Sequence, residues 1–278
     1  MTVTESAPET EVVEPDPVVL VALRGTDLGV TAATLDDVER TRISAENRLR
    51  SMTRDETDSD GIIRGLGLPT TPLGESVHPE VNRVEEIVSH LIEIEKMAIK
   101  DVERSMRRHP LGPWVRSTIG IGDKQAARLL AAIGDPYWNT LHDRERTVSE
   151  LWAYCGLHTV PAEPDLSKLD EGEDPPKDAP RVAARRRRGV RANWSNTAKM
   201  RAYLIASSCI KHAKSPYRKV YDERRDHTAQ THPDWTAGHS HNDALRRVAK
   251  AVLKDLWIQA RNLHHPDRKP EEESAPVQ

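Results

Sequence analysis

Two glycines, Gly120 and Gly122, precede an Ala- and Leu-rich stretch in the segment RSTIGIGDKQAARLLAAIGDP (116–136). A glycine inside a helix costs about 1 kcal/mol relative to alanine, so the pair predicts a sharp turn whose backbone approaches another group closely. Backbone N–H groups at the start of the following helix could donate to a phosphate. Lys124 and Arg128, one helical turn apart, could reach flanking phosphates. The alternative is a tight turn between helices with no ligand.

A second group of candidate phosphate contacts is the run ARRRRGVR (184–191). Its arginines are Arg185, Arg186, Arg187, Arg188 and Arg191. The guanidinium fork matches the geometry of a phosphate, and each neutralised phosphate releases counterions. Trp194 and Tyr203 follow the run and could stack on exposed bases, although core packing is the other use of both side chains. The alternative for the run itself is a solvated linker.

Two Cys-x-x-His pairs, CGLH (155–158) and CIKH (209–212), supply the ligand types of a tetrahedral zinc site. Cys155 and Cys209, however, belong to the apolar faces of Ala- and Leu-rich segments, where a buried thiol is ordinary. Turns and helix starts account for four histidines that precede the last helical stretch: His227, His232, His239 and His241. The sequence therefore predicts neither a metal site nor a cofactor.

The elements that must position these residues are predicted to be helices. The 278-residue chain has 4% aromatic residues, no Phe and 31% charged residues, so it can bury a modest core of Leu, Val, Ile and Ala. Long helices with polar outer faces fit this composition, whereas a thick sandwich or barrel does not. Because no strand pattern and no internal repeat stand out, we expect an all-α fold.

Four parts are expected along the chain. Residues 1–34 form a disordered acidic N-terminus, residues 35–110 a helical, coiled-coil-like segment, residues 111–262 the domain that contains the glycine turn, and residues 263–278 a disordered tail. A charged insertion at 157–193, too polar to pack, interrupts the domain. The long helix therefore leads into the glycine turn, and further helices close the chain.

Residues 79–109 carry the strongest helical pattern, with apolar residues from Val81 to Met97 in a near-heptad stripe. The stripe fits a coiled-coil or bundle helix. It could pack into the protein's own core or form a homo-oligomer with a second copy. Earlier in the chain, residues 34–53 are predicted to form a polar helix with Thr34 as its N-cap.

Three further helix boundaries are predicted from local signals. Gly134 is expected to end the helix that follows the glycine turn. Thr147 and Glu150 match a capping box at the start of a helix over residues 147–156. The last helix is expected over residues 241–263.

Charge is segregated along the chain, although its formal net value is only −3. Residues 161–180 hold seven acidic residues against two lysines, whereas residues 181–225 hold fourteen Lys and Arg against two acidic residues. A basic surface beside an acidic stretch indicates a polyanionic partner. It also allows the acidic stretch to screen the basic one.

Two cysteines give no disulfide framework and favour a reducing compartment. The N-terminus is acidic, and the longest apolar run, VVLVAL (18–23), is too short to span a bilayer. We therefore expect a cytoplasmic protein with no membrane partner.

The glycine turn, with a helix expected on either side, resembles the helix-hairpin-helix element of DNA-binding proteins. The surrounding chain is similar, in order and spacing, to the C-terminal part of the one-ten family of insertion-sequence transposases, also called DEDD transposases. The segments that carry this resemblance lie within residues 79–262 and are GIGDKQAARLLAAIGDPYW, TVSELWAYCGLHTVP, NTAKMRAYLIASS and ALRRVAKAVLKDLW. The resemblance implies an all-α domain whose partner is DNA, and family members also bind a structured RNA.

The resemblance further implies two catalytic features. Family members have an N-terminal resolvase-like domain whose four carboxylates bind divalent metal, and the residues before position 79 show no such pattern. They also use a C-terminal serine, usually in a Ser-Gly pair, as the recombination nucleophile. Ser167 and Ser195 are the two candidates here, and neither is followed by glycine. Ser195 is also suited to cap a helix N-terminus.

Three hypotheses follow from these observations. The first is a nucleic-acid-binding protein related to transposases, whose catalysis is lost or supplied by a partner. The second is an active recombinase with a C-terminal serine nucleophile. The third is a helical adaptor that dimerises through residues 79–109.

Overall fold

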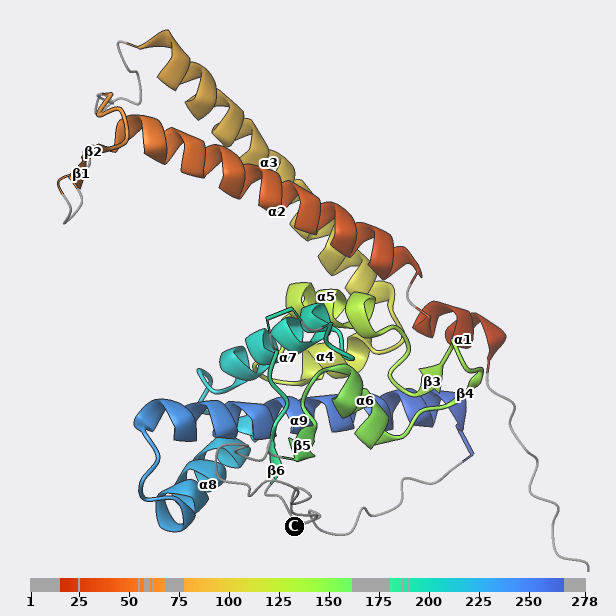
Figure 1. Cartoon of the computed structure of the whole chain (residues 1–278). Coiled ribbons are helices and arrows are strands. Elements are labelled where there is room, and N and C mark those ends of the chain that lie inside the picture. The colour runs from red at the N-terminus through yellow and green to blue at the C-terminus, as the bar shows by residue number, and fades with distance from the viewer. Residues whose placement is uncertain are drawn as a thin grey trace, which may run out of the picture. The chain divides into compact units, whose positions relative to one another are not determined.

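The computed structural model describes residues 16–24, 26–54, 56–57, 61, 63–68, 78–161, 181–186, 188–189 and 191–267. The chain is all-α, as its composition predicts, with a few strands of two or three residues (Figure 1). It divides into two compact units. One unit is formed by Thr26–Arg108, and the other by Met1–Gly25 together with His109–Gln278.

The Thr26–Arg108 unit is a hairpin of two long helices, α2 (Thr26–Thr53) and α3 (Pro79–Arg108), which pack against each other. In the chain between them, β1 (Glu56–Thr57) pairs antiparallel with β2 (Ile63–Arg64). Arg42 of α2 forms an ion pair with Glu95 of α3, which joins the two helices. The helix predicted over residues 79–109 is confirmed.

Two expectations about the N-terminal residues are wrong. Within the range 1–34, α1 (Pro17–Leu23) is helical and has Asp16 as its N-cap. α2 begins at Thr26, so Thr34 lies inside the helix and does not cap it. Several apolar side chains of this region are buried: Leu23, Leu28, Ala32 and Leu35. Their burial stabilises a segment whose composition alone indicates disorder.

The stretch Pro17–Thr53 contains a window that is long and apolar enough to cross a membrane. Core helices of soluble proteins meet the same criterion, and Leu23 and Leu28 are buried in this protein. The stretch is therefore weak support for a membrane span.

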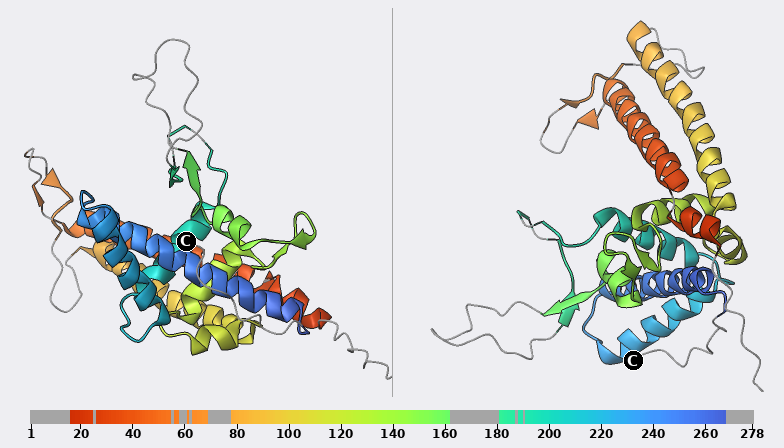
Figure 2. Two further views of the ribbon diagram at one scale, coloured as in Figure 1. Left: turned by 90° about the horizontal axis from the view of Figure 1, so that it is seen from below. Right: turned by 90° about the vertical axis from the view of Figure 1, so that its right-hand side faces the viewer.

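The second unit is built along α9 (Ala237–His264). Its apolar residues recur every three or four positions and are buried: Ala244, Leu245, Val248, Ala249, Val252, Leu253, Leu256 and Ala260. α6 (Val148–Tyr154), α7 (Asn196–Cys209) and α8 (Pro216–Thr231) pack on α9 (Figure 2). α1 also contacts α9, while α5 (Asp123–Ile133) contacts both α7 and the short α4 (Gly112–Ser117).

Two small antiparallel ladders belong to the same unit. β3 (Trp138–Asn139) pairs with β4 (Arg144–Glu145), and β5 (Thr159–Pro161) pairs with β6 (Arg181–Ala183). The expectation that the insertion 157–193 is too polar to pack is wrong for Leu157 and Ala184, which are buried, whereas β6 is exposed along its length. Arg181 supports the second ladder, because its Nε donates to Thr159 Oγ1 at 3.0 Å and its Nη2 donates to the Thr159 carbonyl at 2.7 Å.

Local signals place several helix boundaries correctly. Thr147 and Glu150 form a capping box at the start of α6, and Ser195 is the N-cap of α7. Gly134 ends α5 with a positive φ of 67°. Each signal acts within one turn of chain, which is why the sequence predicts it.

α9 is longer than predicted at both ends. It starts at Ala237 because the Thr236 hydroxyl accepts the His239 N–H at 3.2 Å and caps the helix there. His239 and His241 therefore lie in the first turns of α9, which confirms the prediction that they belong to a helix start. The helix continues to His264, inside the predicted tail 263–278.

Candidate nucleic-acid interface

The predicted hairpin is present, because residues 118–122 join α4 to α5 in a tight turn. The Ile121 N–H donates to the Thr118 carbonyl at 3.2 Å and closes the turn. Gly120 has a φ of +99°, which residues with side chains rarely adopt. Gly122 is the N-cap of α5 and has a φ of −94°. The two glycines therefore differ in backbone conformation.

Gly120 approaches the protein's own helix α7. A Cβ built on this glycine would lie 2.8 Å from the Cα of Cys209 and 3.2 Å from the Oγ of Ser215. The Cys209 thiol also donates to the Gly120 carbonyl at 3.6 Å. The close approach that the sequence indicates is real, and its partner on the Cβ side of Gly120 is α7. Contact of the Gly120 backbone with a phosphate stays a prediction. The glycine is required for packing of the hairpin against the end of α7.

Gly122 is exposed, and a Cβ built there would meet no heavy atom within 4 Å. The N–H groups of Gln125 and Ala126 donate to its carbonyl and begin the helix. Lys124 is half-exposed, whereas Asp123 places a carboxylate in the same first turn. An anion could reach the hairpin at Gly122 and at Lys124, although Lys124 already interacts with another group of the protein and Asp123 opposes an anion's approach.

Arg128 is not available to an external phosphate. Its side chain is only 5% exposed and already interacts with other groups of the protein. Ala127 and Leu129, its neighbours on α5, are also buried. The prediction for Arg128 is therefore wrong, because the middle of α5 is enclosed by the fold while its first turn is not.

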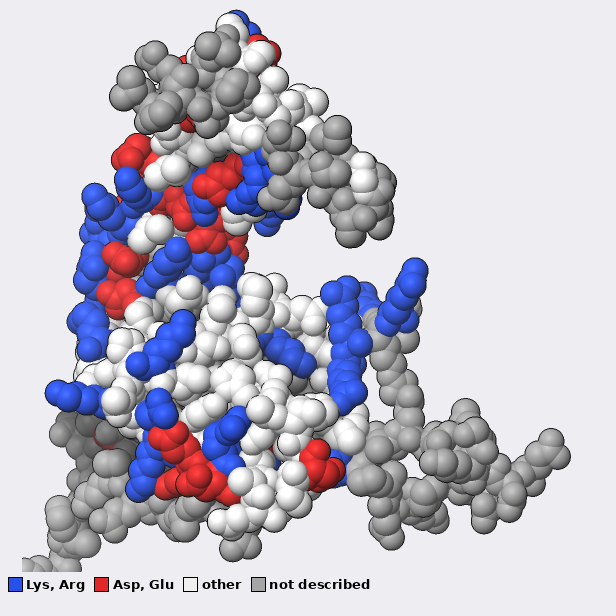
Figure 3. All heavy atoms as spheres, turned by 90° about the vertical axis from the view of Figure 1, so that its left-hand side faces the viewer, with Lys and Arg blue, Asp and Glu red and all other residues white. Residues whose placement is uncertain are grey.

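The arginine run is exposed where the structure describes it. Arg185, Arg186, Arg188 and Arg191 are all exposed, and Arg187 lies outside the described residues. Ala184, just before the run, is buried and anchored: its N–H donates to the His158 carbonyl at 3.2 Å, and its carbonyl accepts from Lys199 Nζ at 3.1 Å. Figure 3 shows Lys and Arg side chains projecting from one edge of this unit.

The hairpin and the arginine run are not brought together. Gly120 packs on Cys209 at the C-terminal end of α7, whereas the run ends just before Ser195, the N-cap of the same helix. α7 has 14 residues, and a rise of 1.5 Å per residue makes it roughly 20 Å long. The two candidate phosphate contacts are therefore associated with opposite ends of one helix.

Of the two candidate nucleophiles, Ser195 serves as a helix cap. Its Oγ accepts the Ala198 N–H at 3.1 Å, and its own N–H donates to the Tyr154 carbonyl at 2.8 Å. Among the residues with described positions, no histidine or carboxylate hydrogen-bonds to this hydroxyl, so no general base activates it there. Ser167 lies outside the described residues.

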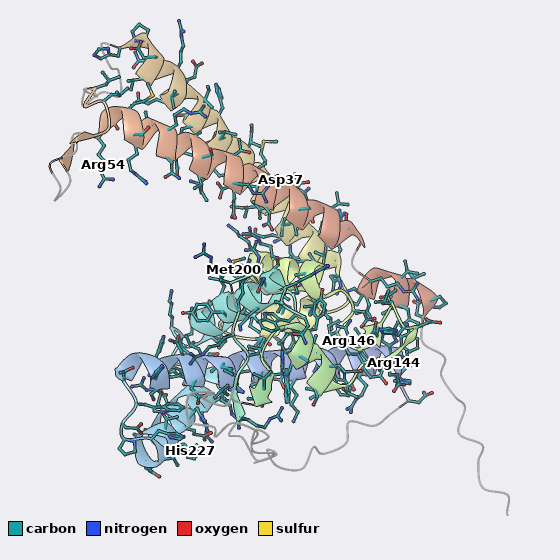
Figure 4. The ribbon with its side chains drawn as sticks, viewed as in Figure 1. Asp37, Arg54, Arg144, Arg146, Met200 and His227 are labelled. Atoms are coloured by element: carbon teal, nitrogen blue, oxygen red, sulfur yellow. The ribbon has the colours of Figure 1, made fainter. Side chains whose placement is uncertain are left out.

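The two aromatic candidates for base stacking differ in accessibility. Trp194 packs over Gly156, where a Cβ would lie 2.5 Å from the indole Cδ1, so the core-packing alternative is correct for this side chain. Tyr203 is 47% exposed on α7, as is the nearby Met200 at 46% (labelled in Figure 4). Tyr203 therefore remains a candidate for stacking.

The Cys-x-x-His pairs do not form a metal centre in the described part of the chain. Cys155 and Cys209 are buried free thiols. Burial raises the pKa of the Cys155 thiol to about 12 and that of Cys209 to about 11, which disfavours the thiolate that zinc requires. The described residues include no group of three or more His, Cys, Asp or Glu side chains that could hold a metal ion.

Three further basic residues lie near Ala184 and the start of the arginine run, and no sequence pattern singles them out as a group: Lys199, Arg246 and Lys250. Lys199 contacts the Ala184 carbonyl, and Arg246 Nε donates to the Leu157 carbonyl at 3.3 Å. The spacing of Arg246 and Lys250 on one helix face was the available signal. Their proximity to Lys199 depends on how α7 packs on α9, which local patterns do not predict.

No family model matches the chain, and no curated protein matches it.

Proposed function

We propose that this chain is a nucleic-acid-binding protein related to the C-terminal part of the one-ten family of transposases, and that it contacts phosphates of DNA. One observation carries the proposal. Arg185, Arg186, Arg188 and Arg191 are all exposed, and none is within ion-pair distance of a carboxylate among the described residues.

Other arginines of the same unit are neutralised within the protein. Arg144 (labelled in Figure 4) pairs with Glu150 at 2.5 Å, and Arg218 pairs with Asp222 at 2.9 Å. Arg224 is likewise paired with Asp243. Arginines with no carboxylate partner among the described residues can attract an external anion, and the guanidinium fork suits the phosphates of a nucleic acid.

The hairpin supplies a second contact through Gly122 and Lys124. A separation of roughly 20 Å along α7 corresponds to about six base-pair steps of a duplex at 3.4 Å each. We expect one duplex, or one folded RNA, to reach both contacts. Contacts of this kind position the protein on the polymer and carry little sequence information. Ser195 is assigned no catalytic role, because its hydroxyl caps α7.

Fluorescence anisotropy with labelled duplex DNA and a labelled RNA hairpin tests the proposal. We expect the triple variant Arg185→Ala/Arg186→Ala/Arg188→Ala to weaken binding roughly 10- to 100-fold at physiological salt. The matched control replaces three exposed, ion-paired basic residues of the other unit: Arg40, Lys96 and Arg104. Equal losses of nucleic-acid affinity in the two triple variants, or no binding by the native chain, would refute the assignment of the arginine run as a phosphate contact.

A second function, self-association through α3, is favoured by a row of exposed apolar residues. Ile87, Ile94 and Met97 are between 47% and 65% exposed, and their spacing of seven and then three residues is that of coiled-coil a and d positions. Val81 and Val88 on the same helix are buried. The apolar stripe of α3 thus has one row buried in the protein and another that a second copy could cover.

Sedimentation analysis of the native chain and of Ile94→Glu separates the adaptor hypothesis from the first proposal. A native dimer that dissociates in the variant supports self-association through α3. A native chain that stays monomeric at micromolar concentration excludes it, whatever its affinity for nucleic acid.

A further inference from the structure

Basic side chains from α7 and α9 donate hydrogen bonds to two adjacent backbone segments, one at Leu157 and the other at Ala184. Arg246 Nε of α9 donates to the Leu157 carbonyl at 3.3 Å, and Lys199 Nζ of α7 donates to the Ala184 carbonyl at 3.1 Å. The His158 carbonyl accepts the Ala184 N–H at 3.2 Å, so these two segments lie side by side. Lys250 lies one helical turn after Arg246, on the same face of α9. Lys199, Arg246 and Lys250 are called the basic cluster below.

Aromatic rings hold the two lysines of the cluster in place. Lys250 Nζ lies 4.4 Å from the centre of the Trp152 ring, and the Trp152 Nε1–H donates to the Lys250 carbonyl at 3.0 Å. Lys199 Nζ lies 5.3 Å from the centre of the Trp194 ring. The ammonium groups are therefore ordered, unlike those of lysines that extend freely into solvent.

The charges of the basic cluster repel one another and are only half exposed. Burial, followed by the charges of Arg246 and Arg247, lowers the pKa of Lys250 to about 8. Burial and Arg246 also lower the pKa of Lys199. His158 has its pKa lowered by burial and by the charges of Lys199, Arg246 and Lys250, so its ring is neutral at neutral pH. Burial is the largest cause of each shift, and repulsion between the neighbouring positive charges adds to it.

Among the described residues, one carboxylate forms an ion pair with the basic cluster. Asp243 lies 3.7 Å from Arg246, but it also forms an ion pair with Arg224. Neither Lys199 nor Lys250 has an ion pair with any carboxylate in the part of the chain that the structure describes. Three ordered, half-buried cations with one shared carboxylate suit an anion that accepts several hydrogen bonds.

We propose that Lys199, Arg246 and Lys250 form a binding site for one phosphate group of the nucleic-acid backbone. This inference rests on the proposed function and deepens it. Ala184 contacts both Lys199 and His158, and Arg185 and Arg186 follow it directly, so the site continues into the exposed arginine run. The cluster extends the interface from the arginine run onto α7 and α9.

Substitutions of the two lysines by methionine test the site, because methionine keeps the apolar stem over each tryptophan and removes the charge. We expect Lys250→Met and Lys199→Met each to weaken nucleic-acid binding about five- to tenfold, and to reduce the slope of log affinity against log salt by about one. Lys219→Met is the matched control, because Lys219 is exposed on α8 and pairs with Glu223. Thermal unfolding of each variant shows whether it is folded.

Three outcomes are distinguishable. If folded Lys250→Met and Lys199→Met bind as tightly as Lys219→Met, with an unchanged salt slope, the basic cluster is not a phosphate site, although the proposed function stands. If the native chain binds neither DNA nor RNA, the proposed function fails. In that case the pKa of the Lys250 side chain is measured by NMR with and without inorganic phosphate. A pKa that phosphate raises supports a site for free phosphate at the basic cluster. An unchanged pKa shows that the basic cluster does not bind phosphate.

Discussion

A β-carbon on Gly120 would collide with the backbone of Cys209, and a φ of +99° would strain any other residue there. Gly122 has neither restriction. We expect Gly120→Ala to lower the free energy of unfolding by about 2 kcal/mol or more. Gly122→Ala should lower it by at most about 1 kcal/mol, through loss of a favourable N-cap residue. Urea denaturation followed by circular dichroism measures both, and equal losses would contradict the packing assigned to Gly120.

His109 gives the stability a defined pH dependence. Its imidazole is buried, and its Nδ1 accepts the Leu111 N–H at 3.2 Å. Burial lowers its pKa from 6.5 to about 4, although the nearby Asp135 acts in the opposite direction. The unfolded chain protonates this histidine near pH 6.5, whereas the folded protein keeps it neutral. The neutral imidazole of His109 therefore makes its full contribution to the free energy of unfolding above pH 6.5. That contribution is lost as the pH falls from 6.5 toward 4.

The variant His109→Asn removes this titration and keeps an acceptor near the position of Nδ1. Between pH 7 and pH 4.5 we expect the native chain to lose about 2.5 kcal/mol more unfolding free energy than the variant. Urea midpoints at the two pH values provide the measurement. If both proteins lose stability in parallel, protonation of His109 is not the cause.

Residue-scale features are predictable where their partners are local. Thr147, Ser195 and Gly134 each act within one turn of chain, and the sequence predicts all three boundaries. The partner of Gly120 is 89 residues away, at Cys209. The sequence therefore indicates that the glycine backbone approaches something, but only the fold shows that α7 is what it approaches.

At the scale of elements, we expect the acidic segment between β5 and β6 to oppose the binding of an anion to the arginine run. It carries the seven acidic residues of positions 161–180 and directly precedes the exposed arginines. Its two ends are held together, because Pro161 and Arg181 are partners in the ladder. A Gly/Ser linker of the same length in place of residues 162–180 should therefore leave the fold intact while removing the acidic charge.

We expect this replacement to raise affinity for DNA several-fold at low salt, since the acidic residues repel or compete with phosphates. The gain should disappear at high salt, where exposed charges are screened. Anisotropy titrations at two salt concentrations measure the effect. A lower affinity in the linker variant would show that residues 162–180 contribute to binding instead of opposing it.

Elements are predictable where they bury an apolar stripe over several turns. α3, α5 and α9 have such stripes, and the sequence locates all three. α1 and the start of α2 have the composition of a disordered segment and are ordered by burial of Leu23 and Leu28. β5 and β6 have three residues each, which is too few to give a recognisable strand pattern in the sequence. The two strands are separated by residues 162–180, so no local signal predicts that they pair.

At the scale of the whole molecule, the two compact units carry different candidate functions. The arginine run, the exposed half of the hairpin and the basic cluster all belong to the unit that contains residues 109–278, and the exposed row of α3 belongs to Thr26–Arg108. The formal net charge of −3 does not reveal that the candidate phosphate contacts all lie in one unit. Binding of nucleic acid and self-association are therefore separable by substitutions in one unit or the other.

The salt dependence of nucleic-acid affinity tests the central claim most directly. If exposed arginines bind phosphates, log affinity for duplex DNA or structured RNA falls linearly with log salt concentration. In the variant Arg185→Ala/Arg186→Ala/Arg188→Ala the slope should be shallower by roughly two to three, close to 0.9 for each phosphate contact removed. Weak binding that does not change with salt, for both polymers and in both proteins, would contradict the claim that this surface recognises nucleic acid.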